Sequence, residues 1–216
     1  MKLKVFETFT SIQGESTHAG KICFFIRLSG CNLNCSYCDT QYAKTPESGT
    51  EMSLCNLVSL AKKAGVPIVE ITGGEPLLQH RVPILCEKLQ EAGLIVMVET
   101  NGTQPVDILP PGTIRIIDCK CPSSGESDKM LLSNFDCLKP FDEVKFVISD
   151  ENDFLYATDK IKKFGILKKT RNILFSPVFG KFPAAKLAEL MIKHKSPGRL
   201  QLQLHKYIWE PSARGV

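Results

Sequence analysis

Three cysteines fall within one short stretch of the chain, Cys31-Asn32-Leu33-Asn34-Cys35-Ser36-Tyr37-Cys38. The C-x3-C-x2-C spacing is suited to three thiolates that converge on one metal centre, and it is too tight for three separate structural roles. A structural zinc site or an ordinary iron–sulfur cluster takes four protein ligands. Three thiolates therefore predict an iron–sulfur cube with one iron left open to another ligand. The alternatives are a zinc site whose fourth ligand lies elsewhere, and unrelated buried cysteines.

Composition predicts one globular domain spanning residues 1–216, because 43% of the residues are hydrophobic and 23% are charged. The net charge of +4 is small and scattered, so nucleic acid is not expected as a partner. No apolar segment follows the first residues as in a signal peptide, and no run approaches the ~20 apolar residues of a membrane helix.

Cysteine usage points to a reducing compartment. The nine cysteines are odd in number and are not spaced as a disulfide framework, so a cytoplasmic location is expected. The six outside the short stretch are predicted to be small buried hydrophobic residues. These are Cys23, Cys55, Cys86, Cys119, Cys121 and Cys137.

Strand and helix patterns alternate along the chain. Strands are predicted at 22–28, 68–72, 94–99, 114–119, 143–149, 172–176 and 199–205, and helices at 52–65, 77–92, 151–164 and 183–195. This alternation predicts an α/β fold with a parallel sheet, either open or curled as an incomplete, partial TIM-type barrel. One crossover, 120–142, is rich in Pro, Gly and Ser and gives no confident helix. In such folds the active site lies at the C-terminal ends of the strands.

Each predicted strand has one apolar and one charged face, since alternate side chains point to opposite sides. The first strand places Ile22, Phe24, Ile26 and Leu28 on its apolar face. The opposite faces of the strands carry Arg27, Glu70, Glu99, Asp118, Lys120 and Lys145. We therefore expect helices to cover the apolar faces and the charged faces to line a polar lumen. The alternative is a one-sided antiparallel sheet with its polar face in water.

A glycine turn follows the second predicted strand, as Thr72-Gly73-Gly74-Glu75-Pro76. Glycine lets the backbone approach a neighbour closely, although turns use glycine in any case. Together, the three-cysteine pattern and this GGEP sequence resemble the radical S-adenosylmethionine (SAM) superfamily. The resemblance implies that the open iron of a 4Fe-4S cluster binds SAM, and that an electron from the cluster cleaves SAM to a 5′-deoxyadenosyl radical. It also implies that the GGEP backbone meets the methionine amino group.

Further segments resemble the 7-carboxy-7-deazaguanine synthase family. They are residues 9–16 (FTSIQGES), 38–40 (CDT), 99–102 (ETNG), 118–125 (DCKCPSSG) and 203–207 (QLHKY). The resemblance implies a modified radical SAM core and a lyase of queuosine and 7-deazapurine biosynthesis. The reaction converts 6-carboxy-5,6,7,8-tetrahydropterin to 7-carboxy-7-deazaguanine with loss of ammonia, after the radical abstracts the C6 hydrogen. It further implies Mg2+, a homodimer, and a reducing partner such as flavodoxin or ferredoxin.

The resemblance also assigns roles to residues. Cluster ligands are Cys31, Cys35 and Cys38, and the Mg2+ ligand is Thr40, whose hydroxyl suits a hard cation. Without the resemblance, a hydroxyl that caps its own backbone is the favoured reading of Thr40. Cofactor contacts fall on Tyr37, Asp39, Gly74, Asp118, Cys119, Lys120, Ser176, Pro177, Val178 and Phe179. Substrate contacts fall on Ile12, Gln13, Gly14, Glu15, Arg27, Thr72 and His205.

Arg27 needs an anion beside it, because a guanidinium inside a barrel is desolvated and keeps its charge. That anion is either the substrate carboxylate or a glutamate on a neighbouring strand, for which Glu70 and Glu99 are the candidates. Two other functions remain open at this stage. A glycyl-radical-enzyme activase shares the cysteine pattern but acts on a protein, and a non-catalytic metal-binding module has no turnover at all.

Overall fold

The computed structural model describes all residues, 1–216, and contains one nine-stranded sheet of order β3-β1-β2-β4-β5-β6-β7-β8-β9. The strands are β1 (Lys2–Ile12), β2 (Ile22–Leu28), β3 (Thr50–Ser53), β4 (Ile68–Gly73), β5 (Ile95–Thr100), β6 (Ile114–Asp118), β7 (Glu143–Ile148), β8 (Asn172–Pro177) and β9 (Arg199–Leu200). Neighbouring strands from β2 to β9 pair in parallel, whereas β1 is antiparallel to both β2 and β3. The alternative of a one-sided antiparallel sheet is therefore wrong.

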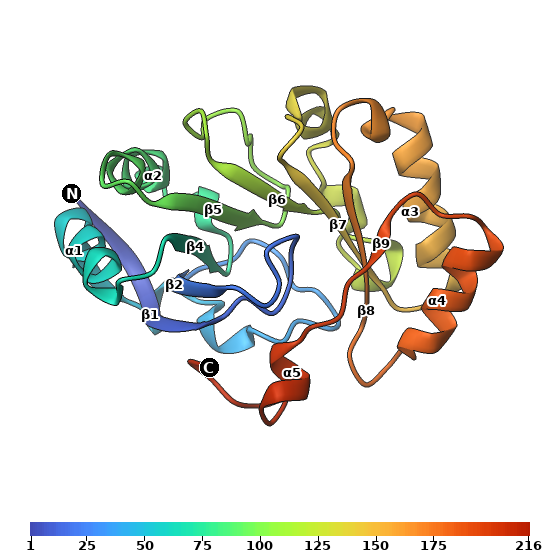
Figure 1. Ribbon diagram of the computed structural model, residues 1–216, viewed down its shortest axis with the longest axis horizontal. Coiled ribbons are helices and arrows are strands. Elements are labelled where there is room, and N and C mark those ends of the chain that lie inside the picture. The colour runs from blue at the N-terminus through green and yellow to red at the C-terminus, as the bar shows by residue number, and fades with distance from the viewer.

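Four longer helices lie along the sheet, with α1 and α2 beside one end and α3 and α4 beside the other (Figure 1). The α-helices are α1 (Leu54–Ala64), α2 (Val82–Glu91), α3 (Glu151–Lys163), α4 (Ala184–Lys193) and the short α5 (His205–Ile208). Short 3-10 helices are η1 (Gln41–Ala43), η2 (Pro46–Ser48), η3 (Pro76–Leu78), η4 (Pro122–Ser124), η5 (Ser127–Lys129), η6 (Leu132–Cys137) and η7 (Ile166–Lys168). None of the helices is long and apolar enough to cross a membrane.

Local sequence sets the helix ends. The Ser53 side chain accepts a hydrogen bond from the Asn56 amide at the start of α1, and Gly65 (φ 68°) ends that helix in the left-handed region. The Asp150 side chain caps α3 in the same way by accepting from the Asp153 amide. Pro83 lies in the first turn of α2, where its missing N–H costs no helical hydrogen bond.

The apolar strand faces pack under the helices as predicted, except that Ile22 at the start of β2 is exposed. A single cluster of 36 buried residues joins Phe24, Ile26 and Leu28 of β2 to the apolar faces of the other strands and to α1–α4. On the opposite side of the sheet a second, small cluster holds Cys23, Phe25, Ile68, Met97 and Ile116. The charged residues lie on this second side, which forms the concave, partial-barrel interior.

The strand β1 was not predicted. Its pairing with β2 shifts register between Val5 and Glu7, and such a bulge breaks the two-residue alternation by which a strand is recognised. The edge strand β3 likewise occupies the start of the predicted helix 52–65, so that helix begins only at Leu54.

Two other predicted elements are shorter in the structure. The helix predicted at 77–92 is divided into η3 and α2, because the proline at position 83 belongs in a first turn. The strand predicted at 199–205 ends at Leu200. Beyond it Gln201 still donates to the Phe175 carbonyl (2.8 Å), but Pro177 has no N–H with which to continue the ladder. The segment 120–142 contains only 3-10 helices, as its composition suggested.

Candidate active site

The three cysteines Cys31, Cys35 and Cys38 lie on the loop that follows β2. All three are free and partly buried, and all line one cavity of about 650 Å³. The cavity lies at the C-terminal ends of the parallel strands, where active sites of barrel-like α/β proteins form. The structure contains no group of three or more His, Cys, Asp or Glu side chains placed closely enough to hold a single metal ion.

The glycine turn after β4 packs directly against the cysteine loop. The Glu75 amide donates to the Gly30 carbonyl (2.8 Å), and a Cβ at Gly74 would lie 2.1 Å from that oxygen. Gly73 has φ 139°, and a Cβ there would lie 2.1 Å from the Leu28 carbonyl oxygen. The two glycines are thus required by backbone contact with the end of β2 and with the start of the cysteine loop, neighbours that the sequence alone did not identify.

Glu75 ties two strand ends together from a buried position. Its carboxylate accepts from the Thr100 hydroxyl (2.7 Å), the Asn101 amide (2.6 Å) and the Leu77 amide (2.9 Å). Burial raises the pKa of Glu75, which these three hydrogen bonds partly offset. Asn101 in turn donates to the Asn32 side chain (3.0 Å) on the cysteine loop.

The far side of the cysteine loop rests on the segment after β6. The Ser36 hydroxyl donates to the Ser123 carbonyl (2.7 Å), and the Asn34 amide donates to the Glu126 carboxylate (2.7 Å). The loop is therefore held from three strand ends at once, those of β4, β5 and β6. Rigid support of this kind keeps a ligand set in one geometry.

Lys145 lies at the centre of the charged interior and is only 5% exposed. Its ammonium pairs with Glu15 (2.8 Å) and Glu99, and lies 3.7 Å from Asp118. Burial by itself disfavours the charged form, but the surrounding carboxylates hold the pKa of Lys145 well above its ordinary value. The alternation along β7 had placed Lys145 in the lumen, although no role had been assigned to it.

The pKa values of Glu15 and Glu70 are shifted in opposite directions, although both side chains lie in the charged interior. Burial would raise the pKa of Glu15, but Lys145 and the Gln203 amide at 2.8 Å lower it below the usual value. The pKa of Glu70 is raised well above its usual value by burial and by the nearby carboxylates of Glu99 and Glu15. Glu70 accepts a hydrogen bond from the Gln13 side chain.

Arg27 has a permanent carboxylate partner, but neither of the two that were predicted. Its Nε lies 2.8 Å from Oε1 of Glu7, on the unpredicted strand β1, which pairs with β2 in a register that sets Glu7 opposite Arg27. The prediction of Glu70 or Glu99 is wrong because both carboxylates face Gln13 or Lys145. The Nη atoms of Arg27 take part in no hydrogen bond within the chain, so the outer edge of its guanidinium stays available.

The N-terminal segment 12–15 and α5 close the cavity together. The Leu204 amide donates to the Gly14 carbonyl (2.9 Å), and a Cβ at Gly14 would collide with His205 at 2.2 Å from Nδ1. Lys206 pairs with Asp39 (2.7 Å), next to the cysteine loop. Burial lowers the pKa of His205. His205, which the resemblance assigned to the substrate site, thus lies beside the predicted substrate segment.

Thr40 has no role as a backbone cap. It precedes η1 without any side-chain capping bond, and the one contact of its hydroxyl is to the Cys38 sulfur at 3.7 Å. Thr40 lines the cavity beside the cysteine loop.

Most of the residues expected at the site line this one cavity. Outside it are Cys119, whose side chain packs in the large apolar cluster, and the buried Ser176. Pro177 lines a smaller neighbouring pocket. Cys23, Cys86, Cys119 and Cys121 are buried as predicted. Cys137 is only partly buried, and Cys55 is exposed because it lies on the solvent side of α1.

Two buried polar atoms fit a polar cofactor in the cavity. The Tyr37 hydroxyl and Oδ1 of Asp118 lie buried without a hydrogen-bond partner in the chain. Buried polar groups normally have partners, and SAM offers amino and hydroxyl groups of the required kind. Three thiols of one supported loop next to these atoms fit a cluster that binds SAM.

The partial barrel and the three-cysteine loop define a radical SAM enzyme, and residues 25–115 match the radical SAM superfamily. Such an enzyme uses a 4Fe-4S cluster and SAM. The chain is 45% identical to 7-carboxy-7-deazaguanine synthase of Chlorobaculum tepidum, over 99% of this chain and 97% of that protein. It is 39% identical to the Koribacter versatilis protein of the same name, over 99% and 100%. The chain therefore belongs to the 7-carboxy-7-deazaguanine synthase family.

The fold agrees with a solved structure. The crystal structure of QueE from Escherichia coli superposes with a TM-score of 0.74 over 95% of each chain, at 24% sequence identity. This likeness confirms the expected partial TIM-type barrel.

Proposed function

We propose that this chain converts 6-carboxy-5,6,7,8-tetrahydropterin to 7-carboxy-7-deazaguanine with loss of ammonia. The observation that carries the proposal is the single cavity in which the cysteine loop faces a wall of buried, paired charges. The names of its relatives supply the reaction. The cofactor supplies a 5′-deoxyadenosyl radical when bound, and the chain binds and orients the pterin beside it.

Two walls of the cavity bind opposite ends of the pterin. Gln13, Glu15 and the carboxyls around Lys145 present acceptors and donors to the planar, donor-rich ring edge. The outer edge of the Arg27 guanidinium receives the substrate carboxylate in a two-bond fork. Held at both ends, the pterin keeps its C6 hydrogen toward the radical, so positioning is the contribution of these side chains.

Anaerobic reconstitution tests the proposal. The cluster-loaded protein is incubated with the carboxy-tetrahydropterin, SAM, dithionite and Mg2+, and the products are measured by mass spectrometry. We expect 7-carboxy-7-deazaguanine and 5′-deoxyadenosine together. Formation of 5′-deoxyadenosine without the deazaguanine would keep the radical chemistry and overturn the substrate.

Mg2+ is proposed to bind at Thr40, whose hydroxyl has no competing backbone partner. Mg2+ keeps several waters and takes few protein ligands, so a single hydroxyl beside bound substrate suits it. Thr40→Ala is expected to lower turnover and weaken Mg2+ activation, while cleavage of SAM without substrate persists. Equal loss of both reactions would mean that Thr40 supports the cysteine loop instead.

The remaining features of the proposal concern organisation. One sheet and one large core support a single domain over residues 1–216. A homodimer, a cytoplasmic location, and flavodoxin or ferredoxin as the electron donor follow from the family resemblance. Light scattering of the purified protein and turnover with each reduced donor would test the dimer and the donor separately.

A further inference from the structure

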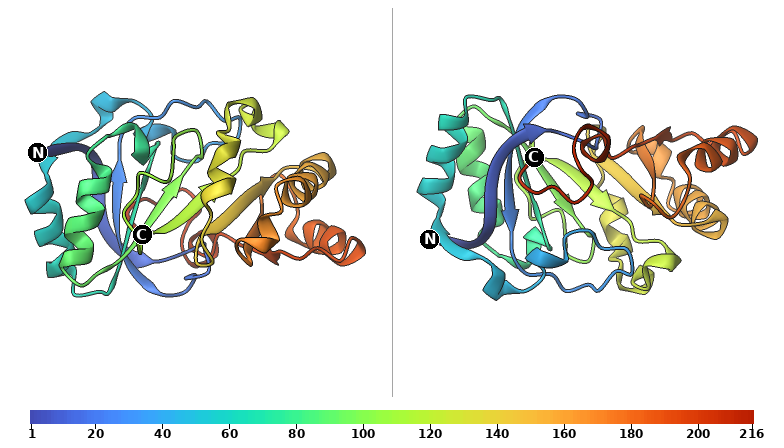
Figure 2. Two further views of the ribbon diagram at one scale, coloured as in Figure 1. Left: turned by 90° about the horizontal axis from the view of Figure 1, so that it is seen from above. Right: turned by 90° about the horizontal axis from the view of Figure 1, so that it is seen from below.

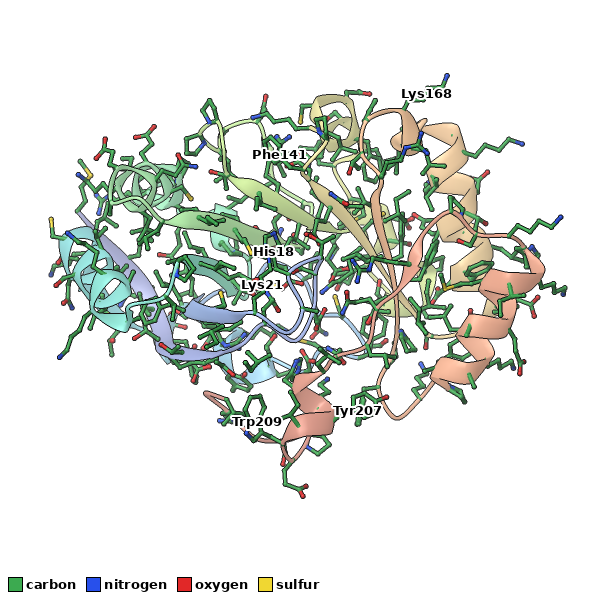
Figure 3. The ribbon with its side chains drawn as sticks, in the orientation of Figure 1. His18, Lys21, Phe141, Lys168, Tyr207 and Trp209 are labelled. Carbon is green, nitrogen blue, oxygen red and sulfur yellow. The ribbon has the colours of Figure 1, made fainter.

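The segment after α5 runs back over the strands, as the view from below shows (Figure 2). Its residues 211–216 line the cavity. Tyr207 and Trp209 mark where this segment leaves α5 (Figure 3). Within it, the Arg214 guanidinium lies 4.2 Å from the ring centroid of Tyr42. Arg27 lies 5.9 Å from the same centroid, so two guanidiniums adjoin one ring at the cavity wall.

The two arginines differ in what neutralises them. Arg27 is bound to Glu7 at 2.8 Å, and the other acid on this side, Asp39, is paired with Lys206 at 2.7 Å. Arg214 takes part in no salt bridge, its guanidinium donates no hydrogen bond within the chain, and it lies over the Tyr42 ring. Arg214 is therefore a positive charge on the Tyr42 side of the cavity that no salt bridge within the chain neutralises.

The opposite wall has the reverse balance. The ammonium groups of Lys145 and Lys120 lie among the carboxylates of Glu15, Glu99 and Asp118, which outnumber them. An anionic substituent is repelled from that wall and attracted to the Tyr42 side. Charge thus orients an anionic ligand in this cavity before any specific contact forms.

We propose that Arg214 is a specificity-determining residue that binds the carboxylate of the pterin beside Arg27. The identity of the ligand rests on the proposed function, whereas the requirement for a carboxylate rests on the charge of the cavity. Arg214 is exposed and lines the same cavity as Arg27, so its guanidinium is accessible to a carboxylate bound there. The competing explanation is that Arg214 only anchors the segment 211–216 on Tyr42.

Binding of two stable aromatic probes separates these explanations. The cluster-loaded parent and Arg214→Gln are titrated anaerobically by calorimetry with 6-carboxypterin and with pterin, which lacks the carboxylate. Losing a hydrogen bond to a charged group corresponds to roughly tenfold to hundredfold weaker binding. We expect that loss for 6-carboxypterin and none for pterin. Arg171→Gln, a change at an exposed arginine outside the cavity, serves as the matched control and leaves both affinities unchanged.

Other outcomes overturn the inference. Equal weakening for both probes means that Arg214 only anchors the segment, and unchanged binding of both means that it does not reach the ligand. Arg214→Lys keeps the charge and is expected to lose less than Arg214→Gln. Fluorescence of Trp209, the single tryptophan of the chain, reports whether the segment stays in place in each variant. Because binding is measured without turnover, a parent that fails to make 7-carboxy-7-deazaguanine would overturn the proposed function and leave this test intact.

Discussion

Two neighbouring residues of β7 show how differently the two sides of the sheet are built. Phe146 points to the outer side, is fully buried, and packs against Phe175 with 5.9 Å between ring centroids. Lys145 points to the inner side and is nearly as buried, but it contacts three carboxylates. Burial on the outer side stabilises the fold by removing apolar surface from water.

Burial of charged side chains on the inner side destabilises the fold instead. Taking charged groups out of water costs free energy, which paired charges recover only in part. A purely structural sheet would gain from apolar residues at these positions. The charged interior is therefore explained by what it binds, and substitutions on the two sides should separate stability from function.

The largest effect is expected at the cysteine loop, where function should vanish while the core stays intact. Cys31→Ala removes one of three proposed cluster ligands, and we expect loss of the cluster and of all turnover. Iron and sulfide analysis with the absorbance of the reconstituted protein measures the first, and product formation measures the second.

The exposed Cys55 gives the matched control, because its thiol lies on α1 outside the cavity. Cys55→Ala should keep the cluster and turnover of the parent. A Cys55→Ala protein without cluster would show that the ligand assignment is wrong.

On the outer side the effect should fall on stability instead. Phe146→Ala leaves a cavity between β7, β8 and α3, and replacing a buried Phe by Ala costs about 3–5 kcal/mol. Denaturant unfolding measures this loss. If Phe146→Ala retained parental stability but lost substrate affinity, the division between the two sides would not hold.

At Arg27 the inner side should lose affinity with little change in stability. Lysine keeps the charge but loses the planar fork, and a hydrogen bond to a charged group is worth about 1.5–3 kcal/mol. Arg27→Lys should therefore bind the carboxy-tetrahydropterin roughly tenfold to a hundredfold more weakly. Parental binding and turnover would leave the Glu7 ion pair as the sole role of Arg27.

The sequence predicted the sheet, its two faces and most cavity residues, because periodicity and strand-end motifs are local signals. It missed β1, where the bulge after Val5 interrupts the alternation, and with β1 it missed Glu7 as the partner of Arg27. Ion-pair partners depend on strand register, which a single strand pattern does not contain.

The sequence also did not predict the parts of the site in which distant segments come together. Tyr42 and Arg214 meet at the cavity wall although they are far apart in the chain and belong to no recognised motif. The contact of Gly14 with His205 has the same origin. Gly14 could be recognised as part of a motif. The reason that glycine is required there is the close approach of α5, which only the structure shows.

The smallest effect is expected at Glu70, where the inner side should gain stability when a charge is removed. Burial, with Glu99 and Glu15 nearby, raises the folded-state pKa of Glu70 well above the ordinary 4.5. Stability linked to its proton is fully present below about pH 4.5 and is lost as the pH rises through the folded-state pKa. Glu70→Gln stays neutral and still accepts the Gln13 hydrogen bond, so it avoids this loss.

Melting curves across pH test the comparison at Glu70. Near pH 4 the variant and the parent should melt at similar temperatures, and toward pH 8 the variant should melt higher. We expect a gain of only a few degrees, because 1 kcal/mol corresponds to about 2–4 °C for a chain of this size. Identical melting temperatures at every pH would mean that Glu70 ionises in the folded protein as readily as in the unfolded chain. The inner charges would then cost the fold nothing, and their presence would no longer require a bound ligand to explain it.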